Sequence, residues 1–233
     1  MSQSSNKKIH KAFVLAAGLG TRLRPLTFKT PKPMLTVGRK PLLDHNLELL
    51  KKAGVKEVVI NLHHLGDQIK KHVGDGKKFG LKVRYSKEKV ILGTGGGIKK
   101  AERFFKNGPF FVINADVWAK IDLKKVEKVF FEQKNIAALM VVRHRKRGED
   151  FAKLDVDSKG QLKSFGRGRF MFTGVQILTQ RVFDFLKIPS CLIQEGYKKF
   201  LENGMIVQTF IHDGFWNDVG TLKIYKKIKK ITT

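Results

Sequence analysis

Two glycines and several cations lie close together near the start of the chain, between Gly18 and Lys32. Gly18 and Gly20 allow the backbone to approach a ligand closely and to point successive N–H groups at it. Fixed positive charge stands beside those donors, on Arg22, Arg24, Lys29 and Lys32. Because backbone N–H donors combined with cations are what a polyphosphate requires, this stretch predicts a phosphate-binding loop.

The spacing excludes two other kinds of phosphate loop. A Walker A loop requires G-x-x-x-x-G-K-[ST], which this stretch does not contain. A dinucleotide-binding fingerprint requires a third glycine at the position that Leu23 occupies. The remaining alternative to a ligand site is a basic turn that follows a core strand.

Two aspartates stand at other positions suited to ligand chemistry. Asp116 follows Pro109–Ile113, the most hydrophobic run in the chain, which predicts a central strand. A carboxylate at the carboxyl end of such a strand lies where open α/β sheets bind ligands. Asp218 lies much later, within Gly214–Thr221. A helix cap is the structural alternative for Asp116.

A second glycine-rich run, Leu92–Ile98, contains four glycines in five residues. It precedes a helical pattern over 98–105 and predicts backbone laid against a flat ligand. A flexible turn is the alternative. The run is not a P-loop, because Ile98 stands where that motif needs glycine.

The order of the expected elements places these residues on one sheet. Apolar runs predict strands at 12–16, 58–61 and 81–86, and apolar repeats predict helices over 41–53 and 65–73 between them. Strands that alternate with helices indicate a parallel sheet with right-handed crossovers. We therefore expect an α/β fold with a Rossmann-like, mostly parallel sheet flanked by helices.

The second half of the chain has a different pattern. After a helix at 123–130 and a strand at 137–143, short apolar segments separated by glycine-marked turns predict antiparallel strands, at 151–154, 162–165 and 171–178. A helix over 193–201, a strand over 205–211 and a final helix from Leu222 follow. The short segments predict a small antiparallel β lid.

Length and composition narrow the class of protein. The chain has 233 residues, of which 42% are hydrophobic, and this fits one α/β domain. No apolar run is long enough to span a membrane, and the first residues lack the apolar segment of a secretory signal. The single Cys191 cannot form an internal disulfide. We expect a cytoplasmic protein with no membrane partner.

The formal net charge of +27 raises nucleic-acid binding as an alternative function. The lysines and arginines are spread over the whole chain, with clusters only at 143–147 and 223–230. No RNP-type aromatic strand or zinc-ligand spacing accompanies them, so nucleic acid is not the expected partner. A positive surface also attracts anionic nucleotides and sugar phosphates.

Taken together, the motifs resemble the signature of the sugar-1-phosphate nucleotidyltransferases. The family pattern A-G-x-G-[TE]-R-[LM]-x-P-L-T, followed by P-K-P, is matched by Ala17–Thr27 and Pro31–Pro33. Three shorter blocks also match: Leu92–Ile98 resembles L-G-T-[AG]-G-[GA], Asn114–Asp116 resembles [NG]-G-D, and Trp216–Thr221 resembles W-x-D-[VI]-G-T. Ala115 replaces the usual glycine and would be strained if its φ were positive.

The resemblance implies the nucleotide-diphospho-sugar transferase fold, with the β lid binding the sugar. It implies a flexible N-terminus over residues 1–10 and a single domain over 11–233, with a nucleotide-binding half at 11–120 and a sugar-binding half at 121–233. The reaction would transfer a nucleoside monophosphate from an NTP to a sugar 1-phosphate and release pyrophosphate.

The resemblance also implies roles for individual residues. Arg22 and Lys32 would be catalytic, and Asp116 and Asp218 would bind Mg²⁺. The nucleotide-binding residues would be Ala16, Ala17, Gly18, Gly20, Thr21, Arg22, Lys32, Gly93, Thr94 and Gly95. The sugar-binding residues would be Asn114, Asp150, Thr173 and Gly174. A solvated loop residue is the alternative for Asp150.

The run Val59–Gly66 resembles two short members of the family, the N-acetylmuramate-1-phosphate uridylyltransferases and the mannose-1-phosphate guanylyltransferases. Leu92–Ile98 and Asp116–Trp118 favour the first, which would use UTP in cell-wall sugar recycling. The alternatives are GTP with mannose 1-phosphate, another hexose or heptose 1-phosphate, and a non-catalytic regulatory relative. We expect a monomer or a homodimer.

Overall fold

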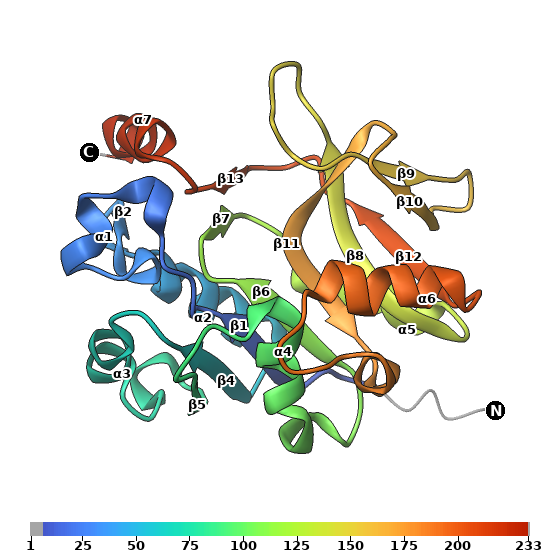
Figure 1. Ribbon diagram of the computed structural model, residues 1–233, viewed down its shortest axis with the longest axis horizontal. Coiled ribbons are helices and arrows are strands. Elements are labelled where there is room, and N and C mark those ends of the chain that lie inside the picture. The colour runs from blue at the N-terminus through green and yellow to red at the C-terminus, as the bar shows by residue number, and fades with distance from the viewer. Residues whose placement is uncertain (1–6, 233) are drawn as a thin grey trace.

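A nine-stranded mixed sheet forms the centre of the protein in a computed structural model, which describes residues 7–232 (Figure 1). Its strands are β1 (Lys11–Leu15), β4 (Glu57–Leu62), β5 (Lys82–Lys87), β6 (Phe110–Asn114), β8 (Ile136–His144), β9 (Leu154–Val156), β10 (Leu162–Phe165), β11 (Phe170–Leu178) and β12 (Ile206–Ile211). The order β6–β1–β4–β5 is parallel, with β5 at the edge. β11 pairs antiparallel with β6, and β8 and β12 continue the sheet beyond it. The expected Rossmann-like arrangement is confirmed.

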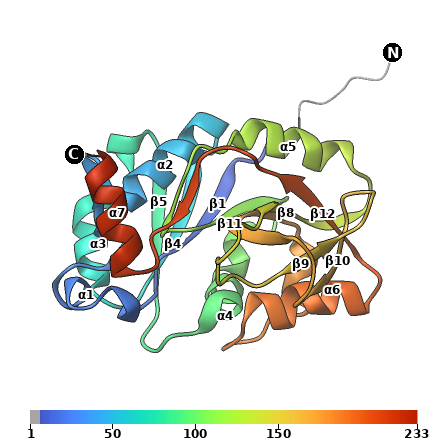
Figure 2. The ribbon, with the colours of Figure 1, turned by 90° about the horizontal axis from the view of Figure 1, so that it is seen from above.

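Helices cover both faces of this sheet (Figure 2). They are α1 (Leu26–Lys29), α2 (Leu42–Ala53), α3 (Gly66–Val73), α4 (Gly93–Lys100), α5 (Leu123–Glu132), α6 (Lys199–Glu202) and α7 (Leu222–Thr232). Side chains alternate between the faces of a strand, so Ala12 and Val14 of β1 pack in the core with α2, α3 and α5, whereas Phe13 packs in the core with α4. The two covered faces explain why β1 and β6 are apolar apart from Lys11 and Asn114 at their ends.

Two short antiparallel pairs lie outside the central sheet. They are β2 (Thr36–Val37) with β3 (Lys40–Pro41), and β7 (Val117–Ala119) with β13 (Trp216–Asp218). A separate apolar cluster joins the two ends of the chain, because Leu23 and Leu35 pack with Val219 and with Ile228 of α7. This cluster fixes the glycine-rich loop near the C-terminal segment.

The strands expected at 162–165 and 171–178 are present, the one expected at 151–154 lies instead at Leu154–Val156, and the longest of the three is not part of a separate lid. β11 pairs with β6 and β8 inside the central sheet, and β9 and β10 extend from its end. Phe170–Leu178 is apolar on both faces and is buried along most of its length, so it pairs inside the central sheet and not in an exposed lid.

The glycine-rich run is helical, contrary to the expectation of a loop before a helix over 98–105. α4 starts at Gly93, and a 3₁₀ turn (Glu102–Phe105) follows it. A Cβ at Gly93, where φ is +75°, would lie 2.3 Å from the Ser190 carbonyl oxygen, and one at Gly95 would lie 2.5 Å from Ser190 Oγ. The glycines therefore allow α4 to pack directly on the segment around Ser190.

The predicted flexible N-terminus is only partly described, because residues 1–6 lie outside the described residues. Ile9 is buried, and its N–H donates to Glu127 Oε1 at 2.5 Å. The His10 carbonyl accepts hydrogen bonds from the N–H groups of Lys56 and Glu57. Ile9 and His10 therefore belong to the packed domain and not to a free terminal segment.

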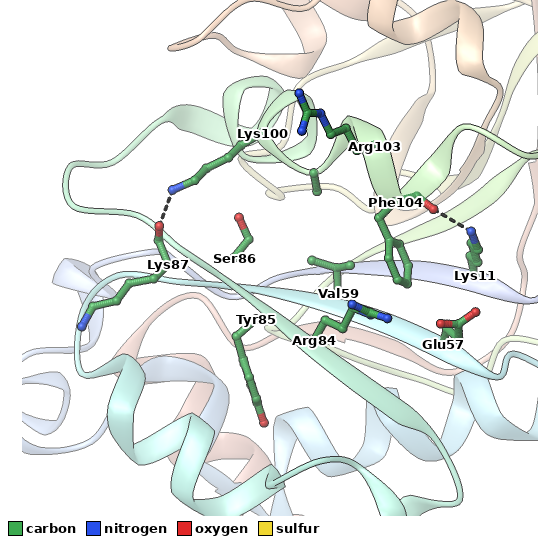
Figure 3. Close-up of a pocket in the computed structure, with 11 residues that line it drawn as sticks. Lys11, Glu57, Val59, Arg84, Tyr85, Ser86, Lys87, Lys100, Arg103 and Phe104 are labelled. Atoms are coloured by element: carbon green, nitrogen blue, oxygen red, sulfur yellow. Dashed lines mark hydrogen bonds between the residues drawn. The ribbon is translucent and has the colours of Figure 1, made fainter.

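Basic side chains gather on β5, the edge strand, on β1, and on α4 and the turn after it (Figure 3). A groove of about 610 Å³ lies there, with the Lys11 ammonium 4.8 Å and the Arg84 guanidinium 5.8 Å from the centre of the Phe104 ring. Lys100 donates a hydrogen bond to the Lys87 carbonyl. Charged side chains on an edge strand oppose pairing with another chain. Among the described residues, no helix is both long enough and apolar enough to cross a membrane.

Candidate active site

The glycine-rich loop leaves the carboxyl end of β1 and turns at Gly20. Gly20 has φ +64°, and its carbonyl accepts hydrogen bonds from Thr27 Oγ1 at 2.9 Å and from the Leu23 N–H at 2.9 Å. The turn therefore requires glycine at this position. Gly18 differs, because nothing lies within 4 Å of the point where its Cβ would be. Gly20 therefore forms the tight turn of the loop, whereas the space beside Gly18 is free of protein atoms.

Asp116 and Asp218, far apart in the sequence, are brought together by backbone pairing. β6 ends at Asn114, so Asp116 lies at the carboxyl end of a central strand. The pairing of β13 with β7 places Asp218 opposite Val117, and the Val219 N–H donates to the Asp116 carbonyl at 3.1 Å. Main-chain hydrogen bonds therefore hold together the two backbone segments that carry these carboxylates.

Lys32 reaches both carboxylates. Its ammonium lies 2.5 Å from Asp116 Oδ2 and 3.7 Å from Asp218 Oδ1. Lys32 begins a 3₁₀ turn, Lys32–Met34, and its side chain is only 12% exposed. Two carboxylates share one nearby ammonium, so the cluster of these three groups keeps a net negative charge.

The surroundings of Asp218 favour a bound cation. Burial raises the pKa of the Asp218 carboxyl, and repulsion from Asp116 raises it further, while Lys32 and Arg22 act in the opposite direction. Asp218 Oδ1 is buried and makes no hydrogen bond. Such an oxygen is costly to leave unpaired, and carboxylate oxygens are ligands that Mg²⁺ prefers.

The protein supplies few ligands for such a cation. Within residues 7–232, no group of three or more His, Cys, Asp or Glu side chains is placed to hold a metal ion. The two aspartates therefore fit a Mg²⁺ ion that takes its other ligands from water or from substrate phosphates, as Mg²⁺ sites commonly do.

Two pockets meet at Asn114 and Asp116, and Lys32 lines neither of them. The first, which we name the α4 pocket, has a volume of about 210 Å³ and is lined by Leu15, Ala17, Gly18, Asn61, Glu88, Ile91, Gly93, Thr94, Asn114 and Asp116. The second, which we name the aromatic pocket, has a volume of about 370 Å³ and is lined by Arg22, Asn114, Asp116, Val117, Asp150, Phe151, Ala152, Leu154, Phe165, Phe172, Thr173, Gly174, Ile193, Trp216 and Asp218. Asn114 and Asp116 line both, so ligands in the two pockets would touch there.

Most of the residues singled out in the sequence lie at these pockets. The α4 pocket contains Ala17, Gly18, Gly93 and Thr94, and the aromatic pocket contains Arg22, Asn114, Asp150, Thr173 and Gly174. Thr21 is exposed at the start of the 3₁₀ turn Thr21–Leu23 beside Arg22. Ala16 and Gly95 are buried, Gly20 closes its own turn, and none of these three lines either pocket.

Thr173 lines the aromatic pocket, but its polar groups are already used. Its hydroxyl donates to the Val141 carbonyl at 2.8 Å, and its own carbonyl accepts from Trp216 Nε1 at 2.8 Å. The hydroxyl is therefore not free to donate to a ligand. The contact with Trp216 indicates that Thr173 orients that ring.

A buried network in the wall of the α4 pocket was missed from the sequence. Asn61 Oδ1 accepts from the Ala16 N–H at 2.7 Å, and Asn61 Nδ2 donates to Glu88 Oε1 at 2.7 Å. Glu88 Oε2 accepts from the Leu92 N–H at 3.1 Å. The network connects the glycine-rich loop with the segment before α4. Its one signal in the sequence is that Asn61 and Glu88 stand at the carboxyl ends of neighbouring strands, as Asp116 does.

The contrast between Gly18 and Gly93 gives a prediction. Gly18→Ala meets no protein atom, so we expect an unchanged melting temperature but NTP binding weakened about tenfold, since the methyl group occupies ligand space. Gly93→Ala places a methyl group against Ser190 at a positive φ and should cost about 1–3 kcal/mol of stability. Thermal melting and calorimetric titration with UTP check both. A large fall in melting temperature for Gly18→Ala, with binding unchanged, would contradict the assignment of Gly18.

Comparison with known proteins agrees with this geometry. A family model described as "Nucleotidyl transferase" matches residues 11–233. An N-acetylmuramate alpha-1-phosphate uridylyltransferase from Neisseria meningitidis serogroup B is 38% identical over 220 residues, which cover 91% of this chain and 94% of the relative. A D-glycero-alpha-D-manno-heptose 1-phosphate guanylyltransferase from Campylobacter jejuni is 32% identical over 92% of this chain and 96% of the relative. The solved structure of HddC from Yersinia pseudotuberculosis complexed with GMP-PN has a TM-score of 0.81 and 26% identity, covering 97% of this chain and 100% of that one.

Proposed function

Because this chain belongs to the nucleotidyl transferase family and is a sugar-1-phosphate nucleotidyltransferase, we propose that its substrates are UTP and N-acetylmuramate 1-phosphate. The observation that carries this choice is the apolar lining of the aromatic pocket. N-acetylmuramate carries methyl groups on its acetamido and lactyl substituents and a carboxylate on the lactyl group, whereas mannose and heptose present only hydroxyls. The relative named as an N-acetylmuramate alpha-1-phosphate uridylyltransferase aligns with 91% of this chain.

The aromatic pocket is poor in polar groups for a sugar site. Eight of its lining side chains are apolar: Val117, Phe151, Ala152, Leu154, Phe165, Phe172, Ile193 and Trp216. Away from Asp116 and Asp218, the polar side chains are those of Arg22, Asn114, Asp150 and Thr173, and the Thr173 hydroxyl already donates to Val141. A site that discriminates between unsubstituted hexoses depends on hydrogen bonds to hydroxyls. The lining of this pocket instead suits a sugar that buries methyl groups.

The cationic groups are placed to hold phosphates during the transfer. The sugar phosphate is ionised at neutral pH, so its oxygen attacks the α-phosphorus of the NTP without a general base. The attack needs alignment and charge neutralisation. We assign the β- and γ-phosphates, which leave as pyrophosphate, to Arg22 and the backbone of Gly18–Thr21. Lys32 would neutralise the α-phosphoryl oxygens and the incoming phosphate.

Asp116 and Asp218 would hold one Mg²⁺ ion beside those phosphates. When bound, this ion supplies positive charge that stabilises the phosphoryl oxygens. Lys32, already 2.5 Å from Asp116, must then exchange this contact for one with a phosphate. The α4 pocket would receive the nucleoside, with its backbone near Gly93 and Thr94.

A heptose 1-phosphate guanylyltransferase is the second candidate. Its support is the relative of that name at 32% identity and the structure complexed with GMP-PN at 26% identity. That enzyme would use GTP and a sugar without acyl groups. The aromatic pocket is the feature that argues for the first candidate.

Steady-state kinetics on matched sugars test the choice. With UTP, we expect kcat/KM for N-acetylmuramate 1-phosphate to exceed that for mannose 1-phosphate by about 100-fold, because mannose lacks the acetamido and lactyl groups that would contact the pocket. N-acetylglucosamine 1-phosphate is the control, since it keeps the acetamido group and lacks the lactyl group, and it should fall between them. A preference for GTP with a heptose 1-phosphate would replace this proposal with the second candidate.

A further inference from the structure

The structure assigns a positioning role to Arg143, which does not line the aromatic pocket itself: we propose that its ion pair with Glu149 holds one wall of that pocket and thereby sets the affinity for the sugar phosphate. This deepens the proposed function and rests on the aromatic pocket being the sugar site. Arg143 lies near the end of β8 and is buried, with 7% of its surface exposed.

Arg143 joins two segments that are distant in the chain. Its guanidinium pairs with the Glu149 carboxylate on one side, and its centre lies 4.5 Å from the centre of a Trp216 ring on the other. Trp216 is further held by its hydrogen bond to the Thr173 carbonyl. A planar guanidinium can pair with a carboxylate and stack on an aromatic ring at once, which an ammonium does less well.

Glu149 in turn orders the segment before Asp150. Its Oε2 accepts from the Lys146 N–H at 2.8 Å, and its carbonyl accepts a hydrogen bond from the Arg145 guanidinium. Burial alone would raise the pKa of Glu149, but the hydrogen bonds from Arg143 and Lys146 outweigh it and hold the pKa below its usual value. The carboxylate is therefore ionised and the ion pair is kept at neutral pH.

The two segments meet in the wall of the aromatic pocket. Phe151 directly follows Asp150, and its ring packs edge-on against Trp216 with 5.6 Å between ring centres. Phe151, Asp150 and Trp216 all line the pocket, and none of them lines the α4 pocket. Arg143 itself lines a neighbouring pocket of about 840 Å³ that shares Asp150, Phe151 and Trp216 with the aromatic pocket. It therefore lies behind a wall of the aromatic pocket and not beside the α4 pocket.

The position of Asp218 is secured separately. Although Trp216 and Asp218 are both in β13, that strand is held by its pairing with β7. Loss of Arg143 removes one of the contacts that hold the indole ring and the ion pair that orders the 145–151 segment, without releasing the main chain of β13. The expected effect is therefore on sugar binding more than on the chemical step.

The test measures the two KM values separately for Arg143→Met. We expect the KM for N-acetylmuramate 1-phosphate to rise about tenfold or more, because displacement of a pocket wall costs alignment, while the KM for UTP stays within about twofold. Arg143→Lys keeps the charge and should give an intermediate value. Arg147→Met is the matched control, since Arg147 is exposed on the same segment, and its KM values should match wild type.

A double-mutant cycle separates this role from general loss of structure. Together, Arg143→Met and Glu149→Gln should raise the sugar KM by less than the product of their separate fold-changes, because both substitutions remove the same ion pair. Equal rises in both KM values, or an unchanged sugar KM in folded Arg143→Met, would overturn the inference. If wild type prefers another sugar 1-phosphate, that sugar replaces N-acetylmuramate 1-phosphate in the assay. The proposed substrate then fails while the role of Arg143 is still decided.

Discussion

Asp218→Asn is expected to lower kcat by about two to three orders of magnitude, the scale seen when one preorganised electrostatic group is removed. The substitution keeps the shape of the side chain and removes the charge that would help to hold Mg²⁺. The pairing of β13 with β7 is made by the main chain, so the strand should keep its place. The measurement is the rate of pyrophosphate release at saturating substrates and Mg²⁺.

The same substitution should not destabilise the fold. The pKa of Asp218 is raised in the folded protein, so its ionisation costs stability as the pH rises through that pKa, and Asn removes this cost at neutral pH. We expect the melting temperature at pH 7 without metal to be equal to or above that of wild type. Asp213→Asn, an exposed position in the preceding loop, is the control and should keep full activity. Near-normal turnover in Asp218→Asn would refute the metal assignment.

Lys32→Ala should have the second-largest effect and should act mainly on the chemical step. Lys32 pairs with Asp116, so its exchange to the phosphates would gain little in the ground state and more as charge shifts in the transition state. We expect single-turnover rates to fall about 100-fold while the Kd for UTP changes by less than about fivefold.

Lys29→Ala provides the matched control for Lys32→Ala. Lys29 is exposed at the end of α1, in the same basic stretch, and should tolerate the change. If the Kd for UTP rose as much as the single-turnover rate fell, Lys32 would be a ground-state binding residue. The assignment to the transition state would then be wrong.

Local patterns were enough to predict the sheet and one side of the site. An apolar run closed by glycine identified β1 and the loop that leaves it, and the apolar run before Asp116 identified β6 as central. The rule that ligands lie at the carboxyl ends of parallel strands then places the loop and Asp116 at the site. Asp116 could therefore be placed from position alone.

Long-range pairing could not be predicted in the same way. Asp218 reaches Asp116 only because β13 pairs with β7, and nothing local to 216–218 specifies that register. The motif resemblance supplied Asp218 where physical reasoning from spacing could not. The buried Glu88 was missed for the same reason, since its partner Asn61 belongs to another strand.

The helix α4 shows how packing overrides local preference. Glycine is a poor helix former, so four glycines in five residues indicated a loop. The close approach of the Ser190 segment leaves no room for side chains at Gly93 and Gly95, and the helix forms around that contact. The glycines are visible in the sequence, but the Ser190 segment that packs against them cannot be predicted from it.

Pyrophosphate release from UTP and N-acetylmuramate 1-phosphate, with Mg²⁺ and then with excess EDTA, tests the central claim most directly. The account predicts rapid release with Mg²⁺, loss of release with EDTA, and recovery when Mg²⁺ is restored. The reason is that Asp116 and Asp218 would hold the ion together with the substrate phosphates. Release that continues unchanged in EDTA would contradict the role given to the two aspartates. Absence of release under all three conditions would contradict the proposed substrates.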